Sequence, residues 1–249
     1  MKVFISYLFL VFFLSSQAQE RNAQYWAIKG DTASNNKKYE EAIQNYSKAI
    51  ELNPTNPDYY NSRGWVENVL EKYQIAIDDF TNSINLYQQN PDYYNNRGIS
   101  EDNIGKYKKA IKDYKKAIKL DKKAPYYYSN IGLVLGKLRQ HQEAIEYFTK
   151  AISLDQNEPK YYYCKAISMD SLGKYEDAID NYTIAIKLAP KEPCYFCNRG
   201  IANADMGKYK EAIEDYTKSI ELNPNNAFVF YDRGNAKYKL GMFKEAIAD

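Results

Sequence analysis

The chain has 249 residues, of which 34 are Lys or Arg and 32 are Asp or Glu, so its formal net charge is only +2. Binding of nucleic acid needs a concentrated excess of basic residues, and this balance argues against DNA or RNA as the main partner. The sequence contains 26 tyrosines. Most of them recur at fixed spacings, which indicates a structural role for the aromatic residues.

The first 18 residues have the pattern of a secretory signal peptide. Lys2 supplies a positive start, residues 3–14 are apolar, and small residues up to Ala18 favour cleavage after it. The apolar run is shorter than the roughly 20 residues that a membrane-spanning helix needs. We therefore expect an exported protein, periplasmic or secreted, with no stable membrane span after signal cleavage. An uncleaved N-terminal anchor is the alternative, and residues 19–22 are a predicted linker.

From Ala23 to the last residue, a pattern of 34 residues repeats along the chain. Every copy has alanine at position 20 and most have glycine at position 8, so an internal repeat is the first feature to explain. Counted from Ala23, the copies span residues 23–56, 57–90, 91–124, 125–158, 159–192, 193–226 and an incomplete 227–249.

Each copy contains two amphipathic segments joined by a short turn. In the third copy, Tyr107, Ala110 and Tyr114 fall on one face of a helix, because their spacing matches the helical period. Proline at position 1 predicts the start of the first helix, where its missing N–H costs nothing. Glycine at position 15 predicts the left-handed residue that closes this helix. The sequence therefore predicts a helix–turn–helix unit in each copy.

Small and bulky residues recur at fixed positions of the two predicted helices. Position 8 is glycine in most copies and alanine at Ala166, and position 20 is alanine, so the two helices can approach closely. Positions 4 and 24 are aromatic, and the alternation of small and large residues lets helices interlock at native density. A single hairpin leaves an apolar face uncovered, so we expect stability to come from stacking of neighbouring copies.

Together these positions resemble the tetratricopeptide repeat, with aromatic residues at 4 and 24, Gly at 8, Tyr at 17, Ala at 20 and Pro at 32 in several copies. The resemblance covers residues 23–249. It implies an all-α, right-handed superhelical solenoid of helix–turn–helix hairpins, with six full repeats and a truncated seventh. In that family, positions 2, 5, 9, 12 and 13 of the first helices face an inner groove. The resemblance implies that the partner-binding groove here is formed by Asp58, Asn61, Trp65, Asp92, Asn95, Ile99, Asp102, Ser129, Leu133, Tyr163, Ile167, Ile201 and Tyr231.

This predicted groove combines an apolar strip, from Trp65 to Ile201, with amide, hydroxyl and carboxylate side chains. The strip would give affinity for an extended peptide or a short helix, and the polar groups would fix its register. We therefore predict a non-catalytic scaffold for a protein or peptide, with no nucleic acid, small-molecule substrate, cofactor or metal. The alternative interpretation of the strip is packing between repeats. A second hypothesis is a sensory or regulatory region of a larger protein, with a membrane or signalling module beyond residue 249.

Cys194 and Cys197 form a C-x-x-C pair at the start of a predicted helix, where a helix N-terminus lowers the pKa of a thiol. A thioredoxin-like redox enzyme needs a different structural context, and Cys164 adds only one further ligand for zinc. Three interpretations remain: a redox pair, a passive disulfide between Cys194 and Cys197, or thiols that pack or line the groove.

The other titratable residues are expected to be structural or solvated. His141, the one histidine, takes position 17, where other copies have Tyr or Phe, and is expected to substitute for them in packing. The pair Asp78 and Asp79, and the lysine-rich residues 106–123, are expected on the solvated outer face of second helices.

Overall fold

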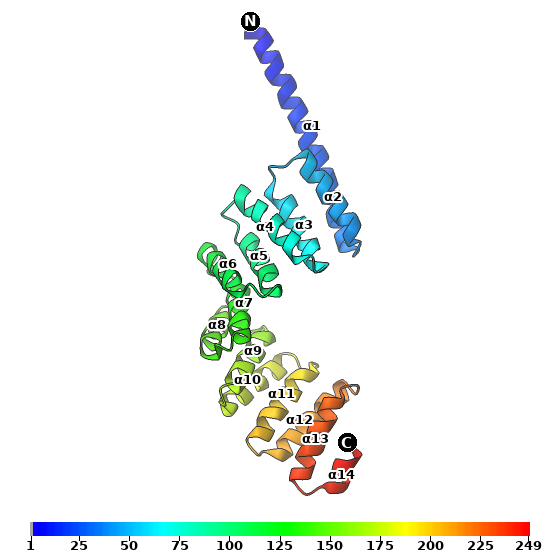
Figure 1. Ribbon diagram of the computed structural model, residues 1–249, viewed down its shortest axis with the longest axis vertical. Helices are drawn as coiled ribbons and strands as arrows, with labels where there is room; N and C mark the ends of the chain where they lie inside the picture. The colour runs from blue at the N-terminus through cyan, green and yellow to red at the C-terminus, as the bar shows by residue number, and fades with distance from the viewer. Residues whose placement is uncertain (1) are drawn as a thin grey trace. The chain divides into compact units, whose positions relative to one another are not determined.

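The computed structural model describes residues 2–249, with side chains from residue 17 onward. Within this part of the chain there are fourteen α-helices joined by short turns, and no strand (Figure 1). The fold is therefore all-α, as predicted. The helices are α1 Lys2–Asn35, α2 Tyr39–Leu52, α3 Pro57–Val69, α4 Tyr73–Leu86, α5 Pro91–Asn103, α6 Tyr107–Leu120, α7 Pro125–Lys137, α8 His141–Leu154, α9 Pro159–Asp170, α10 Tyr175–Leu188, α11 Pro193–Asp205, α12 Tyr209–Leu222, α13 Ala227–Lys239 and α14 Phe243–Ala248.

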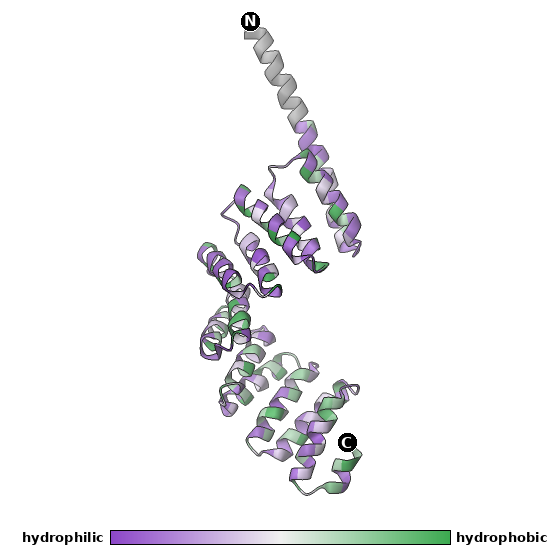
Figure 2. Cartoon of the chain, in the orientation of Figure 1, coloured by the Kyte–Doolittle hydropathy of each residue, from purple (hydrophilic) through white to green (hydrophobic). Residues whose placement is uncertain are grey.

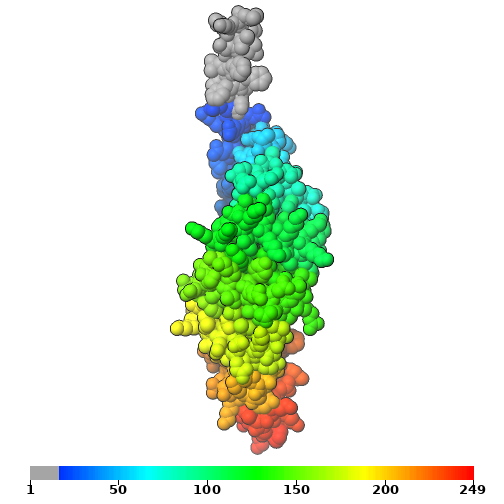
Figure 3. Space-filling model, turned by 90° about the vertical axis from the view of Figure 1, so that its left-hand side faces the viewer, coloured from blue at the N-terminus to red at the C-terminus, as the bar shows by residue number. Residues whose placement is uncertain are grey.

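The chain divides into two compact units, Met1–Lys122 with α1 to α6 and Lys123–Asp249 with α7 to α14. Within each unit, the two helices of a repeat pack against each other, and the second helix of a repeat packs against the first helix of the next. Successive segments of a unit lie beside their neighbours in chain order (Figure 3). Each helix carries hydrophobic and hydrophilic residues together, as a helix with one face in a core must (Figure 2). Each unit is a stack of helical hairpins, which is the predicted solenoid architecture.

Helix α1 is longer than the other first helices and includes residues 19–22, the predicted linker. The predicted signal peptide, residues 1–18, lies almost wholly outside the residues whose side chains are described. Among the helices that are described, none combines the length and the apolarity needed to cross a bilayer.

The first helices begin and end largely where the sequence predicts. Proline is the first residue of α3, α5, α7, α9 and α11, and the side chains of Asn56 and Asn90 cap the next helix by accepting the N–H two residues on, each at 2.9 Å. Glycine at position 15 adopts positive φ in the four copies that have it, as predicted. The other three copies close the helix with a non-glycine residue at the same place, at φ near 60°: Lys37, Glu71 and Arg139.

The glycine at position 8 packs against the aromatic ring at position 24, which explains why these two positions recur together. A Cβ built on Gly132 would lie 2.8 Å from Cε1 of Phe148, and one built on Gly98 would lie 2.7 Å from Cε1 of Tyr114. The alanine at position 20 is fully buried in all six complete repeats. The small positions are therefore helix-crossing points, as the pattern predicts.

The expectation that Asp78 and Asp79 both lie on a solvated face is wrong for Asp79, which is only 3% exposed. Its two carboxylate oxygens accept hydrogen bonds from Nε and Nη2 of Arg63, at 2.7 and 2.8 Å, and Nη1 of Arg63 donates to Ser47 of the preceding repeat at 2.9 Å. A buried carboxylate persists because this bidentate partner compensates its lost hydration. The same arrangement recurs for Arg97 with Asp113 and Thr81, Arg199 with Asp215 and Thr183, and Arg233 with Asp249 and Thr217.

Candidate functional site

The predicted binding residues lie on first helices, and we define the first-helix surface of each unit by positions 2, 5, 6, 9, 12 and 13 of those helices. In the first unit, side chains join α5 to α3 across this surface. Nδ2 of Asn96 donates to Oδ1 of Asn61 at 3.0 Å, and the hydroxyl of Tyr93 donates to Oδ1 of Asp58. These contacts hold the polar groups of neighbouring repeats at a fixed register.

In the first unit, most of the predicted residues are at least partly exposed. Trp65 is 46% exposed, Asp58 and Asp92 are exposed, and Asn61, Ile99 and Asp102 are half-buried. Asn95 differs from the prediction, since it is only 6% exposed and is not accessible to a partner. Position 5 is therefore buried at this repeat. Asn96, one residue further on, takes its place on the surface.

The second unit presents a more apolar first-helix surface. Leu133 is 42% and Ile167 is 37% exposed, and Tyr231 is more exposed still. Tyr163 and Ile201 are half-buried, and the Tyr163 hydroxyl accepts a hydrogen bond from Nδ2 of Asn198 at 2.8 Å. The predicted site residue Ser129 is buried and is not accessible to a partner.

The three cysteines are free thiols in this structure: Cys194 is exposed, and Cys164 and Cys197 are half-buried. Burial raises the pKa of the Cys164 and Cys197 thiols to about 11 and also raises the pKa of Cys194. The expected lowering of the thiol pKa at the helix start is therefore wrong, because desolvation outweighs the helix N-terminus. The disulfide between Cys194 and Cys197 stays a prediction. In the part of the chain with described side chains, no group of His, Cys, Asp and Glu residues is arranged to hold a metal ion.

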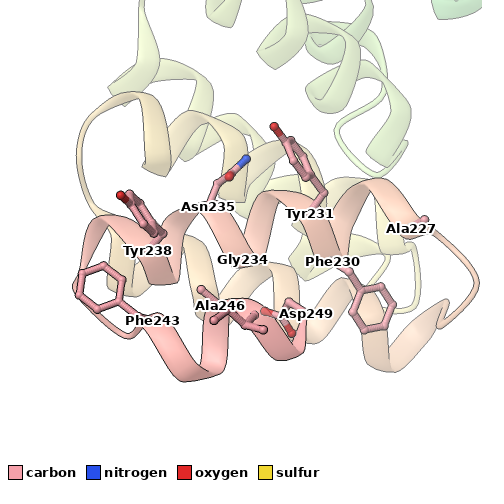
Figure 4. Close-up of a pocket in the computed structure, with 10 residues that line it drawn as sticks. Ala227, Phe230, Tyr231, Gly234, Asn235, Tyr238, Phe243, Ala246 and Asp249 are labelled. Atoms are coloured by element: carbon pink, nitrogen blue, oxygen red, sulfur yellow. The ribbon is translucent and has the colours of Figure 1, made fainter.

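A pocket of about 420 Å³ lies between α13 and α14 (Figure 4). Phe243 and Tyr238 stand at one end and Phe230 at the other, with Gly234 and Ala246 between them. Gly234 is at position 8, and the pocket occupies the place that the aromatic ring of position 24 fills in the preceding repeats. Repeat packing accounts for this pocket, so we assign no ligand to it.

Sequence reasoning missed three carboxylates on the first-helix surface of the second unit: Asp170, Asp205 and Asp232. Burial raises the pKa of Asp170 and of Asp232, and the charge of Asp205 raises that of Asp170 further. Their positions in the repeat, 12, 13 and 6, are the only sequence signal that could have identified them.

Three family models match the chain. Two are described as tetratricopeptide repeat, one matching residues 125–158 and 193–226 and the other residues 215–248, and a third, described as TPR repeat, matches residues 35–66 and 104–138. Together they match more than half of the chain. The chain belongs to the tetratricopeptide repeat family.

Solved structures share the fold at low identity, and two of them are described as tetratricopeptide repeat (TPR) proteins. A structure of Pseudomonas aeruginosa pilF is 17% identical, with 89% of this chain and 99% of that chain covered and a TM-score of 0.74. A tetratricopeptide repeat protein from Parabacteroides merdae is 18% identical, with 91% and 90% covered and a TM-score of 0.73. YrrB, described as a TPR protein with an unusual peptide-binding site, is 21% identical, with 74% and 95% covered and a TM-score of 0.61. No curated protein matches this chain.

Proposed function

We propose that this TPR protein is a non-catalytic scaffold that binds a peptide or protein segment on its first-helix surfaces. The observation that carries the proposal is the exposure of large apolar side chains at one repeat position. Trp65, Leu133 and Ile167 all occupy position 9, and each is more than a third exposed. An apolar side chain left in water at a repeated position gains free energy when a partner covers it, by up to about 1.5–3 kcal/mol for full burial.

Polar groups beside these side chains support recognition of a backbone. Asn61 and Asn96 are joined across two repeats, as are Tyr163 and Asn198, so their remaining donors and acceptors are held in place before a partner arrives. Preorganised amide and hydroxyl groups lower the entropy lost on binding. The peptide-binding site named for YrrB is consistent with this use of the fold.

The proposal is tested with a phage library of random peptides about 12 residues long, which span about 40 Å when extended. Enriched peptides are resynthesised with a fluorescent label, and their dissociation constants are measured by anisotropy. The variant Trp65→Ala, Leu133→Ala, Ile167→Ala is expected to bind them at least about tenfold more weakly, because each truncation removes apolar area that the partner would bury.

A matched control places three apolar truncations on second helices: Ile75→Ala, Ile184→Ala and Leu188→Ala. These side chains are also more than a third exposed, so the loss of apolar surface is comparable. The control is expected to bind as the wild type does. Equal binding by the first-helix variant, or a library that enriches no peptide, would overturn the proposal.

We also propose that the protein is exported, on the basis of the signal-peptide pattern of residues 1–18. Expression of the full chain followed by N-terminal sequencing of the extracytoplasmic protein is expected to show Gln19 as the first residue. An intact N-terminus on protein that stays in the cytoplasm would refute export, and an intact N-terminus in the membrane fraction would favour the anchor.

A further inference from the structure

A second pocket, of about 360 Å³, opens on the first-helix surface of the second unit between α11 and α13. Its apolar wall includes Ile201 and Ala204 of α11, and the aromatic rings of Tyr209 and Tyr216 on α12 contribute the inner lining. Asn235 lines the pocket from α13, and it projects away from α14 in Figure 4. The pocket therefore lies on the surface proposed above to bind a partner.

Two side chains that line this pocket differ from those at the preceding junction. Position 12 is Ala204 here, whereas the preceding repeat has the larger Asp170 at that position. Position 9 of the following helix is Asn235, whereas the preceding junction has the branched Ile201. A small side chain on one wall, and a polar side chain without a branch at Cβ on the other, leave room for an inserted side chain.

Asp205 and Asp232 give this pocket two carboxylates. Elsewhere in the chain, the buried aspartates at position 23 are neutralised by bidentate arginines. In the part of the chain that the structure describes, neither Asp205 nor Asp232 lies within ion-pair distance of a cation, and Lys239 on the pocket rim is exposed. Burial raises the pKa of Asp232, and burial, together with the charges of Asp232 and Asp205, raises the pKa of Tyr216. Asp232 is half-buried and Asp205 is exposed at the mouth of the pocket, so a cation there would offset the desolvation of Asp232 and could pair with both carboxylates.

We propose that this pocket takes a lysine or arginine side chain of the bound peptide. The inference rests on the proposed function and names the chemistry of one residue of its partner. The aliphatic stem of the basic side chain would lie along Ile201 and Ala204, and its charged head would reach Asp205 and Asp232. Basic side chains have this combination of an apolar stem and a cationic head, whereas a metal ion would gain nothing from the apolar wall.

The test uses the same random peptide library and the full chain. Peptides enriched by the wild type are expected to carry Lys or Arg at a shared position, and replacement of that residue by Gln is expected to weaken binding about tenfold to a hundredfold. The variant Asp205→Asn, Asp232→Asn is expected to enrich no shared basic residue. It should bind each basic peptide and its Gln-substituted counterpart with the same dissociation constant. A second variant, Ala204→Leu, fills the pocket without changing charge and is expected to weaken the basic peptides similarly.

The control variant Asp180→Asn, Glu214→Gln removes two negative charges from exposed positions on second helices. This control is expected to keep the preference for peptides with a shared Lys or Arg. If the control lost that preference, net charge and not the pocket would select basic peptides. Peptides that bind without a shared basic residue, or a preference that survives in both pocket variants, would overturn the inference while leaving the proposed function intact. A library that yields no binding peptide would overturn both.

Discussion

Two glycines of helix α7 test whether the small residue at position 8 is required by packing or only tolerated. Gly132 at position 8 and Gly136 at position 12 lie in the same helix, one turn apart. A Cβ on Gly132 would lie 2.8 Å from both Cε1 and Cζ of Phe148, whereas a Cβ on Gly136 would have no other heavy atom within 4 Å. Because both changes to alanine favour the helix equally, the difference between them measures the packing at position 8.

The magnitudes follow from these distances. Gly136→Ala is expected to raise the free energy of unfolding by about 0.5–1 kcal/mol, since alanine loses less backbone entropy. Gly132→Ala has the same favourable entropy effect, but its added methyl group would lie 2.8 Å from ring atoms of Phe148. This distance is well below the usual carbon–carbon separation of about 3.5–4.0 Å. Phe148 is fully buried and has little room to move, so overpacking should cost about 1–3 kcal/mol. We expect Gly132→Ala to be less stable than Gly136→Ala by that amount.

The assay is urea unfolding followed by far-ultraviolet circular dichroism, with the midpoint and the slope compared for each variant. In a Phe148→Leu background, the penalty of Gly132→Ala is expected to shrink, because the shorter side chain vacates the place of the ring; a double-mutant cycle gives the coupling. A Gly132→Ala protein as stable as Gly136→Ala would refute the packing argument.

Three further predictions concern a buried carboxyl group, a buried ion pair and the cysteines. Burial and the charge of a neighbouring aspartate raise the pKa of Glu67 to about 7, so the folded chain holds this proton more tightly than the unfolded chain, and stability falls as pH rises from about 4.5 through 7. Glutamine carries no such proton. As pH rises from acidic to mildly alkaline, the free energy of unfolding of Glu67→Gln, measured by urea unfolding, should therefore increase by about 1–3 kcal/mol relative to that of the wild type. Arg97→Ala should lower the free energy of unfolding by about 3–5 kcal/mol, because Asp113 stays buried without its cation. In the unreduced protein, iodoacetamide should modify the exposed Cys194 before Cys197, as read by mass spectrometry.

Each of these predictions has a control or a contrary outcome. Glu146→Gln makes the same change at an exposed carboxylate and is the matched control for Glu67→Gln. Lys48→Ala removes only the exposed pair with Glu51 and should cost less than about 1 kcal/mol, so an equal loss for Arg97→Ala would contradict the buried-pair argument. Alkylation of Cys164 alone would instead show that Cys194 and Cys197 are joined in a disulfide.

The periodic pattern was sufficient to predict the helical hairpins. Helix α3 begins at Pro57 and helix α11 at Pro193, and Gly105 closes α5 with positive φ, as the sequence indicates. These features are local: a proline or a glycine limits its own backbone angles whatever packs nearby. The repeat of 34 residues supplies the rest, since each hairpin must cover the apolar face of its neighbour.

The candidate site was predicted less completely, because the sequence of a first helix does not show which of its polar residues face a neighbouring repeat. Trp65 is exposed as expected, but Asn95 is buried while the adjacent Asn96 reaches Asn61 across the surface. Positions carried over from a family describe an average geometry. The packing of side chains in these particular repeats decides which neighbour is accessible.

By itself, the sequence determined that this protein is an all-α array of hairpins with variable residues on its first helices. Only the tertiary structure decided that Asp79 is buried against Arg63, and that Asp205 and Asp232 share a pocket. The physical reason is that helical periodicity and capping act within a few residues, whereas the burial of a charge depends on which side chains another helix or the next repeat places opposite it.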